Sequence, residues 1–251
     1  QGYGLKYEDK LVTCNYRRTP EEVDLAHGVT ALARQLGPLD GMKLLQQAAS
    51  SALSLEEFLN SQVAAAGLDT RNLQVLESLL ESVEGLSVDS KLDRMRALVG
   101  ELSQTGIRHS VLFCEYQATL DYLRSAVQDL ELADLAIHSG MTVEAREHTF
   151  SQFQEDGGFL IATSAASQFL SMSFVEAVIH YDLPLSSRAF SERAGLYLGF
   201  GRRIACNTYC LEDETGALPI EAMQLQIARV PDSGSIEMDV DLDALFKRFI
   251  G

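Results

Sequence analysis

Short apolar runs alternate with amphipathic segments over the last two thirds of the chain. Uninterrupted apolar runs are typical of buried parallel strands, and strands are expected at 110–114, 132–137, 159–162, 175–181 and 204–211. Helices are expected between them at 117–130, 141–153, 187–195 and 219–228. This alternation predicts a parallel α/β sheet with right-handed crossovers. The residues expected to be fully buried in that sheet are Val111, Phe113, Ile161, Val178 and Ile179.

The first third of the chain has a different pattern, with one strand-like run at 11–16 followed by helical periodicity. Thr19 can cap a helix that runs to about residue 36, because Pro20 suits the first helical position and Glu22 completes a capping box. Further helices are expected at 41–59, at 68–80 and from residue 89 or 90 onward. The predicted organisation is a strand plus helical appendage over 1–88, an α/β lobe over 89–230, and an acidic loop with a short C-terminal helix over 231–251.

Composition narrows the class of protein. The chain has 251 residues, of which 46% are hydrophobic, so it can bury a substantial core. No apolar run reaches membrane-spanning length and no signal peptide is visible at Gln1, so no membrane partner is expected. The cysteine pattern suits a reducing compartment, so we expect an intracellular protein, nuclear or cytoplasmic. Of the four cysteines, Cys114, Cys206 and Cys210 are expected to be buried, and zinc binding is not expected because Cys206 and Cys210 have no second pair beside them.

The charge of the chain argues against extensive contact with nucleic acid. There are 20 basic and 36 acidic residues, which gives a formal net charge of -16. Binding to duplex DNA depends on neutralising phosphates with lysine and arginine. A local basic groove is compatible with this total, because net charge says little about one face. We therefore expect DNA binding to be weak or absent.

The most specific motif lies at 159–203. A predicted strand ends in Asp182-Leu183-Pro184, and the next helix carries Arg193 and Gly195. This arrangement resembles the second RecA-like lobe of superfamily-two helicases, and within them the Swi/Snf-type DNA translocases. The resemblance implies a RecA-like lobe over 89–230 that pairs with a first RecA-like lobe or another partner protein. It also implies that ATP and magnesium would be bound only together with that first lobe, so no cofactor is expected for this chain alone.

The chain departs from this family at the residues that work on ATP. Glu192 stands where the sixth motif has glutamine, Leu196 where it has its first finger arginine, and Gly199 where it has the second. The fifth motif, Gly-x-Gly-x-Asn, falls on 167–171, where Phe169 replaces a glycine. Phe169 adds a bulky ring where glycine lets the backbone approach a ligand. Both motifs are therefore degenerate, although Arg202 and Arg203 remain as substitutes if the loop is rearranged.

The site assignments follow from the family positions. No catalytic residue and no metal ligand is assigned, and a phosphate-binding Gly-Lys pair is absent from the sequence. The expected nucleotide contacts are Gln168, Arg193 and Gly195, with a purely structural role for Arg193 as the alternative. The expected nucleic-acid contacts are His138, Arg146, Thr163 and Ser164. Packing or capping is the alternative for His138, and an ion pair with Glu144 is the alternative for Arg146.

Two functions remain open at this level. The first is a degenerate helicase C-terminal-like lobe of Swi/Snf type that serves as a non-catalytic module and binds protein or nucleic acid. The second is a working second lobe of an active DNA-dependent ATPase. Under either reading, the chain alone is not expected to hydrolyse ATP. An unrelated α/β enzyme would need a nucleophile or cofactor fingerprint, and none is found.

Overall fold

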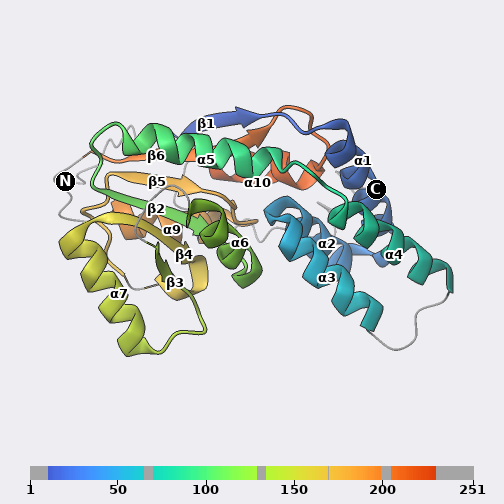
Figure 1. Cartoon of the computed structure of the whole chain (residues 1–251), viewed down its shortest axis with the longest axis horizontal. Coiled ribbons are helices and arrows are strands. Elements are labelled where there is room, and N and C mark those ends of the chain that lie inside the picture. The colour runs from blue at the N-terminus through green and yellow to red at the C-terminus, as the bar shows by residue number, and fades with distance from the viewer. Residues whose placement is uncertain (1–10, 65–69, 129–133, 169, 199–204, 230–251) are drawn as a thin grey trace, which may run out of the picture.

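The computed structural model describes residues 11–64, 70–128, 134–168, 170–198 and 205–229. At its centre is a six-stranded sheet with all strand pairs parallel and the order β1-β6-β5-β2-β4-β3 (Figure 1). The strands are β1 Leu11–Tyr16, β2 His109–Cys114, β3 Asp134–Ile137, β4 Gly158–Thr163, β5 Ala177–His180 and β6 Asn207–Asp213. The predicted parallel α/β sheet is confirmed, and β5 is shorter than the apolar run that predicted it.

The helices follow the predicted order, with one addition and one correction. They are α1 Pro20–Leu36, α2 Pro38–Ser50, α3 Ala52–Ala64, α4 Thr70–Glu84, α5 Ser90–Ser103, α6 Gln117–Val127, α7 Val143–Asp156, the short α8 Ser164–Ser167, α9 Ser187–Leu198 and α10 Pro219–Arg229. The capping box of Thr19 and Glu22 is present as predicted. The C-terminal loop and helix expected over 231–251 lie outside the described residues.

The correction concerns the single helix expected at 41–59, which is two helices broken at Ser51. The backbone of Ser51 is extended, and its hydroxyl accepts a hydrogen bond from the Ser54 amide at 3.1 Å, which starts α3. The same hydroxyl lies 2.8 Å from the hydroxyl of Thr119 on α6. A cap and a contact distant in sequence together interrupt an otherwise helical pattern.

Helices cover both faces of the sheet. On one face, Leu112, Ile161 and Ile179 pack against α5 and α6. On the other face, Val111 and Val178 pack with residues of α7 and α9. These strand residues are at most 2% exposed, as is Phe113, so the predicted core is confirmed. A core buried on both sides explains why the strands are continuously apolar.

The helices α1 to α4 form a separate layer, which we call the helical unit. Its core includes Val29, Leu45 and Leu59, and it continues into Ile220 and Met223 of α10. Figure 1 shows the helical unit beside one end of the sheet. β1 is the edge strand of the sheet, paired with β6, so the strand predicted within 1–88 belongs to the lobe's sheet. The domain boundary at 88 stays a prediction.

Two further features bear on the expected class. Cys14, Cys114, Cys206 and Cys210 are all buried and form no disulfide among the described residues, and the burial of the last three was predicted. Among the described residues, no helix combines the length and apolar character needed to cross a membrane.

Candidate functional site

A cleft of about 520 Å³ opens at the carboxyl ends of β2, β4 and β5. Ligand sites in parallel sheets lie at this edge, because the loops that follow the strands meet there. Its lining consists of Glu115 after β2, Ser164, Ala165, Ser167 and Gln168 after β4, Pro184 after β5, and Ala189, Glu192, Arg193 and Leu196 of α9. Three of the predicted site residues, Ser164, Gln168 and Arg193, line this cleft.

Arg193 lies at the bottom of the cleft with its side chain only 3% exposed. Nη1 donates to the backbone oxygen of Asp182 at 2.6 Å, and Nη2 donates to the hydroxyl of Ser164 at 2.6 Å. Nη2 also forms an ion pair with the carboxylate of Glu115. Burial lowers the pKa of Arg193 to about 10, which leaves it charged at neutral pH. The guanidinium therefore ties together the loops after β2, β4 and β5.

His180 completes this group, which we call the cleft floor: Glu115, Ser164, His180, Asp182 and Arg193. Its Nδ1 lies 3.1 Å from Nη1 of Arg193, and its Nε2 lies 3.1 Å from the hydroxyl of Tyr197. Because arginine can only donate, we assign Nδ1 as an acceptor and the proton to Nε2. Burial lowers the pKa of His180 to about 3, so the ring is neutral.

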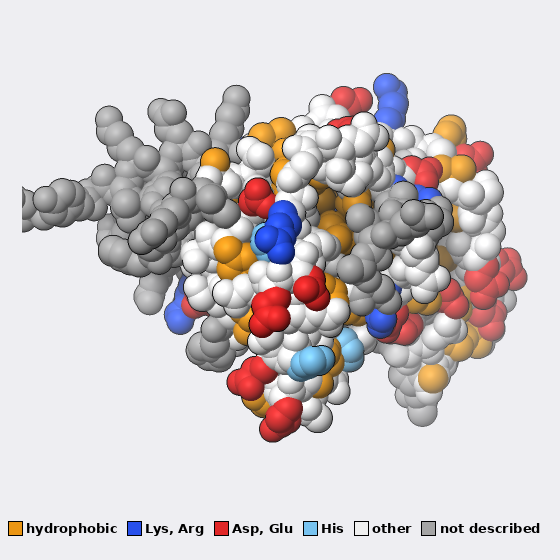
Figure 2. All heavy atoms as spheres, turned by 60° about the vertical axis from the view of Figure 1, so that its left-hand side comes forward, with side chains coloured by type: hydrophobic (Ala, Val, Ile, Leu, Met, Phe, Trp, Pro, Cys, Tyr) orange, Lys and Arg blue, Asp and Glu red, His pale blue; other side chains and the backbone are white. Residues whose placement is uncertain are grey.

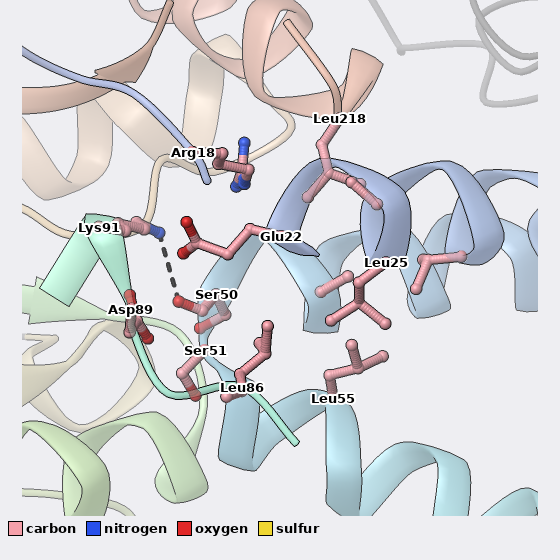
Figure 3. Close-up of a pocket in the computed structure, with 14 residues that line it drawn as sticks. Arg18, Glu22, Leu25, Ser50, Ser51, Leu55, Leu86, Asp89, Lys91 and Leu218 are labelled. Carbon is pink, nitrogen blue, oxygen red and sulfur yellow. Dashed lines mark hydrogen bonds between the residues drawn. The ribbon is translucent and has the colours of Figure 1, made fainter. Parts of the chain in front are cut away.

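Asp182 links the cleft floor to the helical unit. Its carboxylate accepts from the hydroxyl of Ser50 at 2.7 Å, from Nζ of Lys91 at 3.3 Å and from the amide of Glu115 at 2.9 Å. Burial raises its pKa, and the charge of Lys91 opposes this. Figure 3 shows Lys91 of α5 directed at Ser50, whose backbone oxygen it reaches at 3.3 Å.

A second set of contacts surrounds the small cavity of Figure 3, whose volume is about 60 Å³. Arg18 forms ion pairs with Asp213 and with Glu221, the latter at 2.7 Å. Glu22 accepts from the amide of Ser90 at 2.8 Å and from its hydroxyl at 2.5 Å. These contacts bridge α1, α5, α10 and the end of β6. The helical unit is therefore fixed to the lobe by buried polar contacts at two places.

The residues predicted to contact nucleotide are only partly brought together. Gln168 and Arg193 both line the cleft. Gly195 is exposed on α9 and is not among the lining residues, and a Cβ added there would meet nothing within 4 Å. Whether Arg193 contacts nucleotide or has a purely structural role stays a prediction.

The residues predicted to contact nucleic acid fall into an inner and an outer pair. Thr163 is buried at 4% exposure, whereas Ser164 lines the cleft and donates to Oε1 of Glu115 at 2.9 Å. His138 and Arg146, which we call the β3–α7 rim, are partly exposed. Nδ1 of His138 and Nε of Arg146 are buried and have no hydrogen-bond partner among the described residues.

The rim offers one permanent cation to a nucleic acid. Figure 2 shows a face of the molecule on which acidic side chains are scattered and the lysine and arginine side chains form no continuous patch. Few phosphate contacts are therefore expected on this face.

Some site residues were missed from the sequence. Glu115 directly follows β2, which was a usable signal, because side chains after parallel strands gather at one edge. Ser50 and Lys91 gave no comparable signal, since they approach Asp182 only through the packing of the helical unit.

Comparison with known proteins identifies the lobe. Residues 90–195 match the family model of the helicase conserved C-terminal domain. This part of the chain is therefore similar to a helicase C-terminal domain. The matched residues run from α5 into α9 and include Lys91, Asp182 and Arg193.

The curated proteins that the chain matches are RNA helicases of low sequence identity. The chain is 27% identical over 161 residues to the ATP-dependent RNA helicase DBP8 of Kluyveromyces lactis, covering 59% of this chain and 37% of that protein. It is 29% identical over 161 residues to the DEAD-box ATP-dependent RNA helicase 42 of Arabidopsis thaliana, covering 63% of this chain and 14% of that protein. The chain thus spans less than half the length of these relatives.

Solved structures show that the fold extends beyond the helicase C-terminal domain itself. The C-terminal part of the Fun30 ATPase domain superposes with a TM-score of 0.65 at 12% identity, covering 96% of this chain and 95% of that chain. The Pyrococcus furiosus Hef helicase domain gives a TM-score of 0.53 at 13% identity, covering 83% of this chain and 55% of that chain. The RecA-like α/β fold predicted from the sequence is confirmed.

Proposed function

We propose that this chain is a helicase C-terminal lobe of Swi/Snf type that has lost its part in ATP hydrolysis and serves as a non-catalytic binding module. One observation carries this proposal. The arginine that keeps its family position, Arg193, is buried and bonded to Asp182, Ser164 and Glu115, while Leu196 lines the cleft at the family position of a finger arginine. A finger arginine has to reach the transferred phosphoryl group.

The charge of the cleft also supports the loss of ATP hydrolysis. Its described lining carries the carboxylates of Glu115 and Glu192 against the single guanidinium of Arg193. A triphosphate requires an excess of cations or backbone amides around it. These residues alone do not fit a triphosphate with magnesium, which would depend on groups supplied by a first lobe. Phe169, Gly199, Arg202 and Arg203 lie outside the described residues.

The proposal of Swi/Snf type rests on the extent of the similarity. The structure of the C-terminal part of the Fun30 ATPase domain superposes on 96% of this chain, a span that includes the helical unit. The sequence alignments with RNA helicases cover about two thirds of the chain or less. The curated proteins with similar sequences are RNA helicases. Binding assays with both DNA and RNA would therefore test which nucleic acid, if either, the chain binds.

The alternative is a working second lobe of a DNA-dependent ATPase. It is favoured by the fact that Gln168 and Arg193 line one cleft at the correct edge of the sheet. Under this alternative, a first RecA-like lobe would supply the phosphate loop and the magnesium ligands, and ATP would bind between the two lobes.

ATP binding separates the two functions. We expect calorimetric titration of the chain with Mg-ATP to give no heat that fits a micromolar Kd, and ATPase assays with and without DNA to give no turnover. Micromolar binding that is lost in Gln168→Ala and kept in Gln152→Ala, a control on α7, would contradict the proposal and support the alternative.

A further inference from the structure

We propose that the cleft docks a lysine- or arginine-bearing segment of a partner protein. This inference rests on the proposed function, because it takes the cleft to be free of nucleotide. It starts from the exposure of the charged groups that line the cleft. The side chains of Glu115 and Glu192 are 30% and 60% exposed, whereas that of Arg193 is 3% exposed. A ligand entering from solvent therefore meets carboxylates before it meets the guanidinium.

The charge of Arg193 is also compensated inside the protein. Its Nη2 is paired with Glu115, and Nη1 is bonded to the backbone of Asp182 and to His180. Glu192 pairs with Arg188 at 2.9 Å, but both side chains are largely exposed, at 84% for Arg188 and 60% for Glu192. Exposed pairs of this kind contribute little free energy. An incoming cation can therefore share or replace Arg188 at Glu192 at small cost.

The remaining walls suit the aliphatic stem of a basic side chain. Pro184, Ala189 and Leu196 form apolar lining, and Ser164 and Gln168 supply polar atoms. Lysine and arginine bury their methylene stems along apolar surface while the charged head stays with polar groups. The volume of about 520 Å³ accommodates such a side chain together with its neighbours in the peptide.

The whole chain favours the same ligand. Its net charge of -16 attracts cationic segments and repels polyanions at long range. Nucleic acid and nucleotide carry phosphates, which the exposed carboxylate of Glu192 disfavours, while the charges of Glu115 and Arg193 compensate each other. Charge complementarity therefore selects a basic protein segment over a nucleic acid as the occupant.

Fluorescence anisotropy with a labelled peptide of alternating lysine and alanine tests this inference. We expect saturable binding of this peptide and no binding of a matched peptide of alternating glutamate and alanine. Glu192→Lys should weaken binding roughly three- to tenfold, because it replaces an attractive contact with a repulsive one. The matched control is Glu81→Lys on α4, which is exposed and changes the net charge by the same amount; it should alter the affinity less than about twofold.

The outcomes separate this inference from the proposed function. Equal weakening by the two substitutions would show that only the total charge attracts the peptide, and would overturn the cleft as its site. Absence of binding by the lysine peptide, with no ATP binding either, would overturn the inference and leave the proposed function standing. Micromolar ATP binding that displaces the peptide would overturn both.

Discussion

The cleft floor and the β3–α7 rim each hold one arginine that matches a helicase position, and the two arginines have opposite surroundings. Arg193 is buried and bonded to groups after three strands. Arg146 is partly exposed, and its Nε has no partner among the described residues. A residue can therefore keep its motif position because the scaffold depends on it. Nε of Arg193 also has no partner among the described residues, so the two arginines differ in exposure: only Arg146 reaches solvent, where a ligand can meet it.

The largest effect that would sharpen this contrast is on stability. Arg193→Ala should lower the free energy of unfolding by about 3–5 kcal/mol, because it leaves the groups bonded to the guanidinium without a buried partner. Arg193→Lys should not restore it, since lysine lacks the planar fork that reaches the partners on both sides. Urea denaturation measures both. Arg146→Ala is the comparison and should change stability by no more than about 0.5 kcal/mol. Equal losses for Arg193→Ala and Arg146→Ala would break the contrast.

A smaller effect should appear with pH. Burial lowers the pKa of His180 to about 3, below its ordinary value of 6.5 in the unfolded chain. Between these values the unfolded state binds the proton and the folded state does not, so stability falls as the pH is lowered through that window. The loss should reach about 2 kcal/mol at pH 5 relative to pH 7. Thermal unfolding across pH measures it.

The pH effect has a matched control. His180→Gln should remove most of the loss between pH 7 and pH 5, whereas His148→Gln, at an exposed position of α7, should keep it. The raised pKa of Asp182 acts in the opposite direction, since its protonation on acidification relieves a buried charge. The difference between wild type and His180→Gln isolates the histidine. An unchanged pH profile in His180→Gln would contradict the assignment of a neutral, buried ring.

The smallest effect concerns the rim. DNA binding of the isolated chain should be weak at low salt and lost near physiological salt, because the rim supplies one permanent cation. Arg146→Ala should reduce the log–log salt slope by about 0.9, the value for one phosphate contact. Anisotropy with duplex DNA across a salt series measures it. Arg34→Ala, which removes one charge from the exposed last turn of α1, is the control. Submicromolar binding of DNA at physiological salt would contradict the proposal of a non-catalytic module and favour a working lobe.

Local and periodic signals in the sequence predicted most of the fold. The capping box at Thr19 and Glu22 was predictable because its two hydrogen bonds join residues three apart. The strands were predictable because a sheet covered on both faces requires continuous apolar runs. The helix expected at 41–59 failed at Ser51, where the hydroxyl contact with Thr119 joins residues 68 apart. No pattern within one segment contains such a contact.

The sequence by itself determined the parallel α/β order, the buried core and the loops that carry the candidate site, because all three follow from periodicity and from the shared direction of the strands. Only the tertiary structure decided which partners those site residues have. It placed Ser50 on Asp182, 132 residues away, and Glu115 on Arg193, 78 residues away. Such contacts depend on how separate helices and loops pack. They give Arg193 buried partners on three loops, while Glu192 stays largely exposed.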